Sequence, residues 1–146
     1  MKTEINNLTA VRIDSNELKS LCDELFKRGQ GLPGEISIAI VDDKEMKRLN
    51  EKYYGSSGTT DVLSFRYEDG SGEIVLNPYQ HKRQSDHYDN TVNQEFVENL
   101  VHGFLHLAGY DHKSEDDDGR HLNEQNQIMD DLSDKDFPVI LGGTNI

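Results

Sequence analysis

Residues 91–108 constrain the fold more than any other part of the sequence. The apolar residues of this segment recur at helical intervals, and at 100° per residue one broad side collects Val97, Val101, Phe104, Leu105 and Ala108. Gly109 follows, and glycine readily adopts the left-handed conformation that ends a helix. We therefore predict a helix over residues 91–108 with one apolar side.

Shorter segments on both sides of this helix complete the predicted order of elements. Residues 10–13, 35–41, 62–67 and 73–77 have the apolar content typical of strands, and a turn-like stretch between the last two predicts a hairpin or a nearby strand pair. Helices are predicted from Asp14 or Ser15 to Gly29, over 43–54 and from after Ser114 to 132, whereas 78–90 fit a helix, a loop or both. This order predicts an α+β (mixed α/β) fold with a small, about four-stranded mixed sheet flanked by helices.

Length and composition limit the organisation and the partners. A chain of 146 residues forms one domain, 1–146, in which we expect 138–146 to be a loosely held tail. The formal charge of -13 excludes a general electrostatic field for nucleic acid, so any RNA contact must be local. A single cysteine, Cys22, and no apolar signal-like or membrane-length segment favour a reducing cytoplasm.

The segment HGFLHLAGYDH, residues 102–112, contains the residues that indicate a metal site. His102 and His106 lie one helical turn apart on one face, and the reversal at Gly109 lets His112 approach them. Three imidazoles suit one Zn²⁺ ion, although nickel, cobalt or copper could occupy the same ligands. Three protein ligands leave one position open, as in catalytic zinc sites, so hydrolysis is the expected reaction class. The remaining histidines, His81, His87 and His121, are predicted to be surface residues.

The same histidine offsets occur in metallopeptidases of the pattern HExxHxxGxxH, in which the glutamate is the general base. Gly103 occupies the glutamate position here, so the peptidase mechanism lacks its proton-transfer group. Glycine at this position also permits close approach of a packed strand or of a bulky substrate. A metallopeptidase or another small metallohydrolase is therefore the weaker enzymatic alternative.

HGFLHLAGYDH, together with TDVLSF at 60–65 and GEIVL at 72–76, resembles the YbeY family of bacterial rRNA maturation factors. The resemblance implies a cytoplasmic, zinc-dependent, single-strand-specific endoribonuclease that acts in rRNA maturation and ribosome quality control. It also implies His102, His106 and His112 as the ligands of one zinc ion, and rRNA, the ribosome or ribosomal proteins as partners. A ribosome-associated assembly factor with a mainly structural metal is the alternative from another functional class.

Two departures from the family pattern concern substrate binding. Tyr54 stands where the family usually has an arginine, and Arg66 follows the TDVLSF strand where the family commonly has a proline. Arg66 is a candidate phosphate-binding residue in the cleft, against the simpler interpretation of a solvent-facing arginine at the end of a strand. Lys82 and Arg83 are further candidate cations near the site.

Two acidic residues lie close to the predicted ligands. Asp111 precedes His112 and is a weak catalytic candidate that could orient an imidazole or water, although capping of the turn is the simpler interpretation. Glu95 shares the histidine face and could support a ligand, but we expect a solvated carboxylate.

Overall fold

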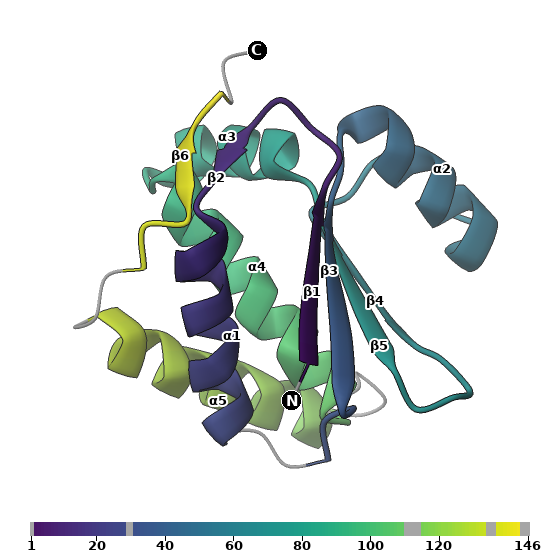
Figure 1. Ribbon diagram of the computed structural model, residues 1–146, viewed down its shortest axis with the longest axis vertical. Coiled ribbons are helices and arrows are strands. Elements are labelled where there is room, and N and C mark those ends of the chain that lie inside the picture. Colours follow the sequence, from purple (N-terminus) through teal and green to yellow (C-terminus); the bar gives the residue numbers. More distant parts are fainter. Residues whose placement is uncertain (1, 29–30, 110–114, 134–136, 144–146) are drawn as a thin grey trace.

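A mixed sheet of four strands organises the part of the chain that the computed structural model describes, residues 2–28, 31–109, 115–133 and 137–143 (Figure 1). The sheet has the order β1-β3-β5-β4 and consists of β1 (Lys2–Asn7), β3 (Glu35–Ile40), β4 (Val62–Arg66) and β5 (Gly72–Leu76). β1 and β5 run parallel to β3, and β4 runs antiparallel to β5. The β4–β5 pair confirms the predicted hairpin: Tyr67 N–H donates to Ser71 O at 2.8 Å across the turn.

Helices cover both faces of this sheet. They are α1 (Ser15–Arg28), α2 (Asp43–Tyr54), α3 (Pro78–Tyr88), α4 (Val92–Leu107) and α5 (Glu115–Ser133). Figure 1 shows α1, α4 and α5 on one face and α2 on the other. The predicted α+β class with a small mixed sheet in a single domain is confirmed. Residues 78–88, for which a helix or a loop was expected, form α3 because Asn77 caps the amides of Tyr79 and Gln80.

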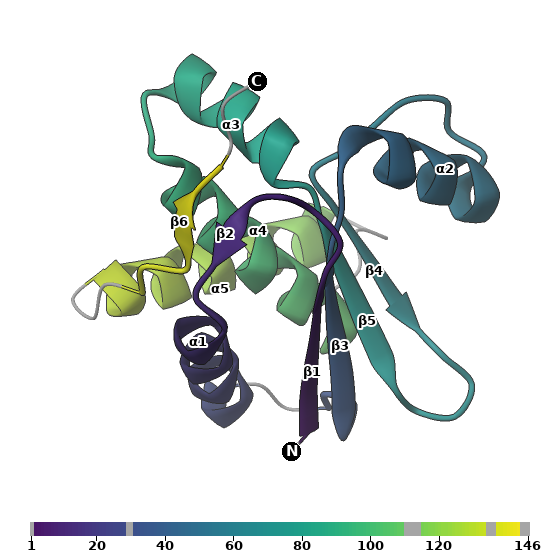
Figure 2. The same ribbon diagram turned by 45° about the horizontal axis from the view of Figure 1, so that its top comes forward.

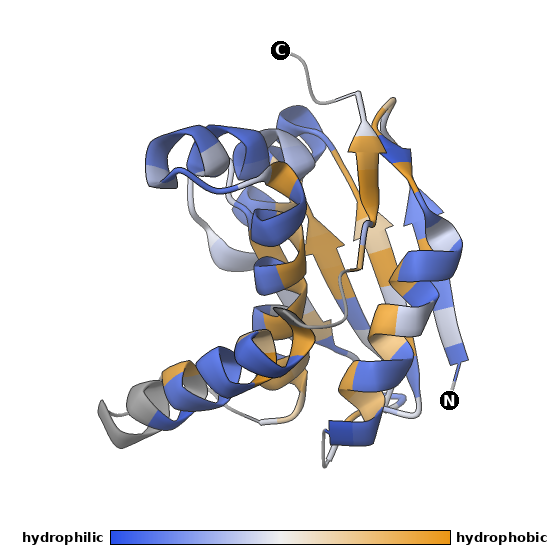
Figure 3. Cartoon of the chain, turned by 90° about the vertical axis from the view of Figure 1, so that its left-hand side faces the viewer, coloured by the Kyte–Doolittle hydropathy of each residue, from blue (hydrophilic) through white to orange (hydrophobic). Residues whose placement is uncertain are grey.

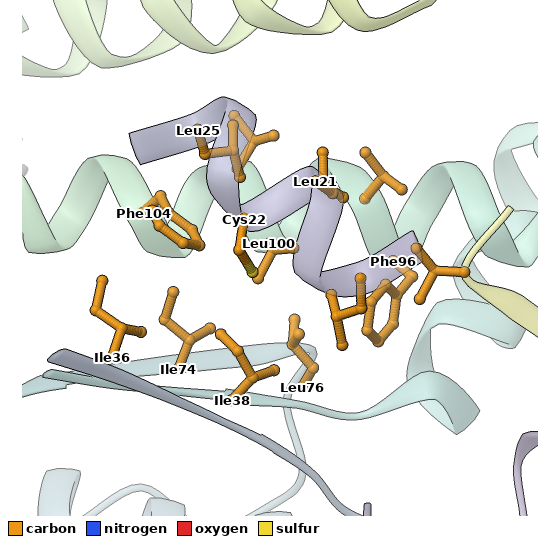
Figure 4. Packing of buried hydrophobic residues seen from close by; sticks show 14 of the residues in the cluster. Leu21, Cys22, Leu25, Ile36, Ile38, Ile74, Leu76, Phe96, Leu100 and Phe104 are labelled. Atoms are coloured by element: carbon orange, nitrogen blue, oxygen red, sulfur yellow. The ribbon is translucent and has the colours of Figure 1, made fainter. Parts of the chain in front are cut away.

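The main core lies between the sheet and helices α1, α4 and α5. Alternate residues of β3 and β5, such as Ile38 and Ile74, point at Leu21 of α1 and Leu100 of α4, and all four are fully buried (Figure 4). Figure 3 shows apolar residues gathered between the helices and the sheet, with hydrophilic residues on the outer helix surfaces. A smaller apolar cluster around Met46 packs α2 on the opposite face. None of the described helices has the length and hydrophobicity that crossing a membrane requires.

Both ends of the described chain depart from the sequence predictions. The first sheet strand is β1, which the sequence analysis did not identify, because an edge strand with mostly exposed side chains lacks apolar alternation. The predicted strand at 10–13 reduces to β2 (Arg12–Ile13), which pairs with β6 (Ile140–Gly142) in a separate two-stranded sheet, seen beside α1 in Figure 2.

The expectation of a loose tail over 138–146 is therefore wrong for residues 139–142. Val139 is completely buried, and its carbonyl accepts a hydrogen bond from Asp14 N–H at 2.8 Å. The side chain of Asn93 on α4 accepts from Val139 N–H and Ile140 N–H, both at 2.9 Å. These backbone bonds need a partner from distant residues, which the local composition of the tail does not reveal.

Helix α4 runs through the centre of the molecule and has well-defined ends. Its first turn has a capping box, in which Thr91 and Gln94 exchange side-chain and backbone hydrogen bonds. At the other end, Gly109 has φ +100°, as the predicted glycine stop requires. α4 contacts β4, β5, β6, α3 and α5, so the helix that carries the histidine segment packs against five other elements.

Candidate functional site

His102 and His106 lie side by side on α4. Their ring centroids are 5.0 Å apart, with an angle of 60° between the ring planes. Both rings line a pocket of about 390 Å³, which also has walls from α2, β4 and the loop between them. The one-turn spacing therefore presents two imidazoles to one open pocket, as the sequence predicted.

Two consecutive side-chain hydrogen bonds through Gln125 of α5 orient the ring of His102. Glu98 accepts a hydrogen bond from Gln125 Nε2 at 3.3 Å, which turns the carbonyl oxygen of the Gln125 amide toward His102. His102 Nδ1 donates to this oxygen at 3.0 Å. A proton on Nδ1 places the lone pair of the imidazole on Nε2, which is the form that coordinates a metal ion.

Gln125 is a site residue that the sequence analysis missed. It is buried on α5, in phase with the buried Ile128 and Leu132 of the same helix. A polar residue on the otherwise apolar, buried face of a helix indicates a buried hydrogen-bond partner, because an unpaired amide in the protein interior costs free energy of folding. That signal was present in the sequence, but the partner lies 23 positions away on α4.

The described residues supply two of the three predicted metal ligands. His112 and Asp111 lie outside the described residues, so their predicted roles stay predictions. Among the residues that are described, no group of three or more His, Cys, Asp or Glu could hold a metal ion. The donor chemistry of the described pair nevertheless fits zinc, because two adjacent imidazoles face one pocket and a carboxamide orients one of them.

A second pocket of about 460 Å³ adjoins the first and shares Asp61, Val62 and His102 with it. Glu95 and Glu98 also line this pocket. The expectation of a solvated Glu95 is wrong: its residue is only 7% exposed, and its carboxylate accepts from Asn90 Nδ2 at 2.9 Å. Burial raises the pKa of Glu98, and the neighbouring Glu95 carboxylate raises it further. Three carboxyl side chains, those of Asp61, Glu95 and Glu98, and no lysine or arginine are among the described residues of this pocket, so it disfavours an anionic phosphate.

The three candidate cations bind elsewhere on the protein. Arg66 donates from Nη1 to Leu107 O at 2.8 Å and from Nη2 to Gly31 O at 3.2 Å, so it caps the carboxyl end of α4. Lys82 pairs with Asp86 at 2.8 Å, and Arg83 pairs with Asp43 at 2.6 Å. None of the three lines either pocket, and the phosphate-binding role of Arg66 stays a prediction.

Gly103 faces the sheet. A Cβ atom at this position would lie 2.9 Å from Ile74 Cγ2 and 3.1 Å from Ser64 Oγ, and Ser64 Oγ donates to the carbonyl of Gly103 at 3.4 Å. Of the two interpretations of this glycine, close packing of a strand is the one that the structure shows. A glutamate here would begin against Ile74, which weakens the metallopeptidase alternative further.

His81 differs from its prediction. It was expected at the surface, but it is completely buried on α3, with its ring edge against Phe96. His81 Nε2 lies 3.1 Å from Asp61 O, and burial lowers the pKa of the imidazole to about 4. His87 is exposed as predicted, whereas the side chain of His121 lies outside the described part.

Acid is expected to destabilise the fold through His81. Between the usual pKa of 6.5 and the folded pKa of about 4, the unfolded chain binds more protons than the folded one, so stability falls as the pH drops through this range. At about 1.4 kcal/mol per pH unit, this group removes about 3 kcal/mol of unfolding free energy by pH 4. Denaturant unfolding at several pH values, with a chelator present to eliminate metal effects, measures the slope. His81→Gln should show a flatter slope, and an unchanged slope would contradict the assignment.

Comparisons with known proteins identify one family for this chain. The family model described as Endoribonuclease YbeY matches residues 4–133. Proteins named Endoribonuclease YbeY include one from Petrotoga mobilis, 35% identical over 85% of this chain and 90% of the relative. Another, from Thermotoga maritima, is 36% identical over 74% of this chain and 73% of its own length. A third, from Thermodesulfovibrio yellowstonii, is 40% identical, and the match spans 62% of that relative.

A solved structure extends the agreement to three dimensions. The solution structure of a Thermotoga maritima protein superposes with a TM-score of 0.67 at 28% identity, over 91% of this chain and 90% of that one. The family match covers every described helix and all strands of the four-stranded sheet apart from the first residues of β1. The chain therefore belongs to the YbeY family of endoribonucleases.

Proposed function

We propose that this protein is a zinc-dependent endoribonuclease that cuts single-stranded RNA during rRNA maturation and ribosome quality control in the cytoplasm. The observation that carries the proposal is the adjacent pair His102 and His106, which opens onto a pocket in a chain of an endoribonuclease family. His112 would complete the ligand set. The proposal treats residues 1–146 as one metallohydrolase domain.

The chain's own residues have separate tasks in this proposal. Gln125 holds His102 in the tautomer that presents Nε2, and Glu98 holds Gln125. The three imidazoles bind the ion, and Asp111 orients the third imidazole or a water molecule. Zinc at this position would polarise a phosphoryl oxygen and provide an activated nucleophile near neutral pH.

The acidic charge favours delivery of the RNA by a partner. With a net charge of -13, the protein has little general attraction for phosphates. A ribosomal surface that presents a single strand would supply the local concentration that electrostatics does not. The same charge also favours the second candidate, a ribosome-associated assembly factor in which the metal is mainly structural.

Metal removal separates the two candidates. After treatment with a chelator, cleavage of a single-stranded RNA should fall by at least about 100-fold, because the ion contributes several kcal/mol to the transition state. One equivalent of zinc should restore cleavage, the circular dichroism spectrum should stay unchanged, and a duplex of the same sequence should remain intact. Loss of the folded spectrum without the metal, or equal cleavage with and without it, would contradict a catalytic zinc.

A further inference from the structure

The histidine pocket is the pocket that His102 and His106 line. A substrate there must be recognised by something other than positively charged side chains of the described pocket walls. Among the described residues that line the two adjoining pockets, none is lysine or arginine. Proteins that bind single-stranded nucleic acids combine basic grooves with aromatic side chains on which bases stack. Where the basic component is missing, stacking has to contribute a larger share of the affinity.

Tyr54 provides an aromatic ring at this pocket. It is the last residue of α2, which lies beside the β4 edge of the sheet (Figure 2), and it lines the same pocket as His102 and His106. The Tyr54 residue is 54% exposed even though it lies at the pocket. An exposed tyrosine beside two candidate ligands is a surface that a bound strand would meet.

The Tyr54 ring is held in place before any ligand binds. Its hydroxyl donates to Ser64 O at 3.0 Å. The ring stacks on Phe65, with ring centroids 5.9 Å apart and an angle of 27° between the planes. Two contacts with β4 therefore fix the ring position, which lowers the entropy that a ligand must remove on stacking.

We propose that Tyr54 is the stacking platform for one nucleobase of the single-stranded RNA that binds at the histidine pocket. The proposal rests on the proposed function, because it takes single-stranded RNA as the substrate. Stacking on one aromatic ring tolerates any base, since every base has a π face. It also disfavours a duplex, whose bases are already stacked and paired.

Tyr53 is a natural control for this proposal. It is 49% exposed, close to the value for Tyr54, and it also contacts Phe65, at a centroid distance of 4.8 Å. Tyr53 differs in that it does not line the pocket and that Lys52 lies 5.1 Å from its ring centroid. The two tyrosines thus have the same side chain, a similar exposure and a common contact with Phe65. They differ in that Tyr54 lines the pocket of the two histidines and Tyr53 does not.

The test is equilibrium binding of a short, labelled single-stranded 2′-O-methyl RNA, followed by fluorescence anisotropy with zinc-loaded full-length protein. The 2′-O-methyl groups block attack by the ribose hydroxyl. Tyr54→Leu should weaken binding by about 10-fold or more, because one stacked base is lost. Tyr54→Phe and Tyr53→Leu should bind within about 2-fold of wild type. An abasic strand of equal length should bind wild type and Tyr54→Leu equally.

A charged variant separates base recognition from phosphate recognition. Tyr54→Arg should make the salt dependence of binding steeper by about 0.7 in the log–log slope, as one added phosphate contact to a single strand does. Wild type and Tyr54→Phe should share a shallow slope. Thermal melting and circular dichroism of every variant verify that it is folded.

Several outcomes would overturn the proposal. They are undiminished binding by Tyr54→Leu, equal losses in Tyr54→Phe and Tyr54→Leu, an equal loss in Tyr53→Leu, or no detectable binding of the strand by wild type. Cleavage of unmodified RNA, measured on the same preparations, reports separately on the proposed function. Zinc-dependent cleavage with no effect of Tyr54→Leu on binding would remove the stacking platform and leave the nuclease.

Discussion

Replacing His106 with alanine is expected to remove both zinc binding and RNA cleavage. His106 shares the pocket with His102, and a site that loses one of three protein ligands cannot hold the ion in catalytic geometry. Cleavage of single-stranded RNA should fall by at least about 1000-fold, because the contributions of the metal to the transition state are lost together. Metal content and cleavage should be measured on the same purified samples.

Two further variants make this experiment specific. His87→Ala removes an exposed histidine that lies in neither pocket, and it should retain full zinc content and cleavage. Gln125→Ala keeps both imidazoles but removes the hydrogen bond to His102, so zinc affinity should fall by about 10- to 100-fold and recover at excess zinc. A His106→Ala protein that cleaves RNA at the wild-type rate would contradict the assignment of the site.

The sequence predicted those parts of the site that depend on one element. The one-turn spacing of His102 and His106, the start of their helix at Thr91 and its stop at Gly109 are all local signals. They survive in the structure because the local preferences and the tertiary packing of α4 agree. Membership of the YbeY family followed from the same segment, since the most specific motif lies within it.

Features that depend on a distant partner were not predictable in this way. From the sequence, Arg66 is expected to be a free cation. In the structure its guanidinium donates a hydrogen bond to the carbonyl of Leu107, 41 residues away. From the sequence, Glu95 is expected to be a solvated helix carboxylate. Other elements cover α4 on several sides, however, so even the polar face of this helix is partly buried. His81 was misplaced for the same reason, because the low hydropathy of α3 does not reveal that it packs on Phe96.

The strand β1 illustrates a different limit. Its register with β3 comes from backbone hydrogen bonds, which every residue type can make. Only Ile5 of this strand packs against the core as a partly buried apolar residue, so no alternation marks the segment. The predicted number of strands in the sheet matched the observed number, although the first predicted strand belongs to the small β2–β6 sheet instead.

Gly103→Val is expected to destabilise the protein by about 3 kcal/mol, because overpacking a dense interior has this order of cost. The new Cβ would lie 2.9 Å from Ile74 Cγ2, a methyl group close to the backbone of a fully buried residue of β5, so one of the two elements must shift. Valine has a slightly better helix propensity than glycine, but this gain is a few tenths of a kcal/mol and cannot offset the clash. The melting temperature should fall by roughly 10 °C for a chain of this size.

The position of Gly103 links this packing defect to the metal site. Gly103 follows His102 directly, and its carbonyl accepts from Ser64, which lines the histidine pocket. Pushing α4 away from β4 and β5 would therefore displace His102 from Gln125 and weaken zinc binding along with the fold. Gly34→Val is the matched control, because a Cβ at Gly34 meets no atom within 4 Å. If Gly103→Val melts at the same temperature as Gly34→Val and binds zinc as tightly as that control, close packing is not the reason for the glycine at position 103.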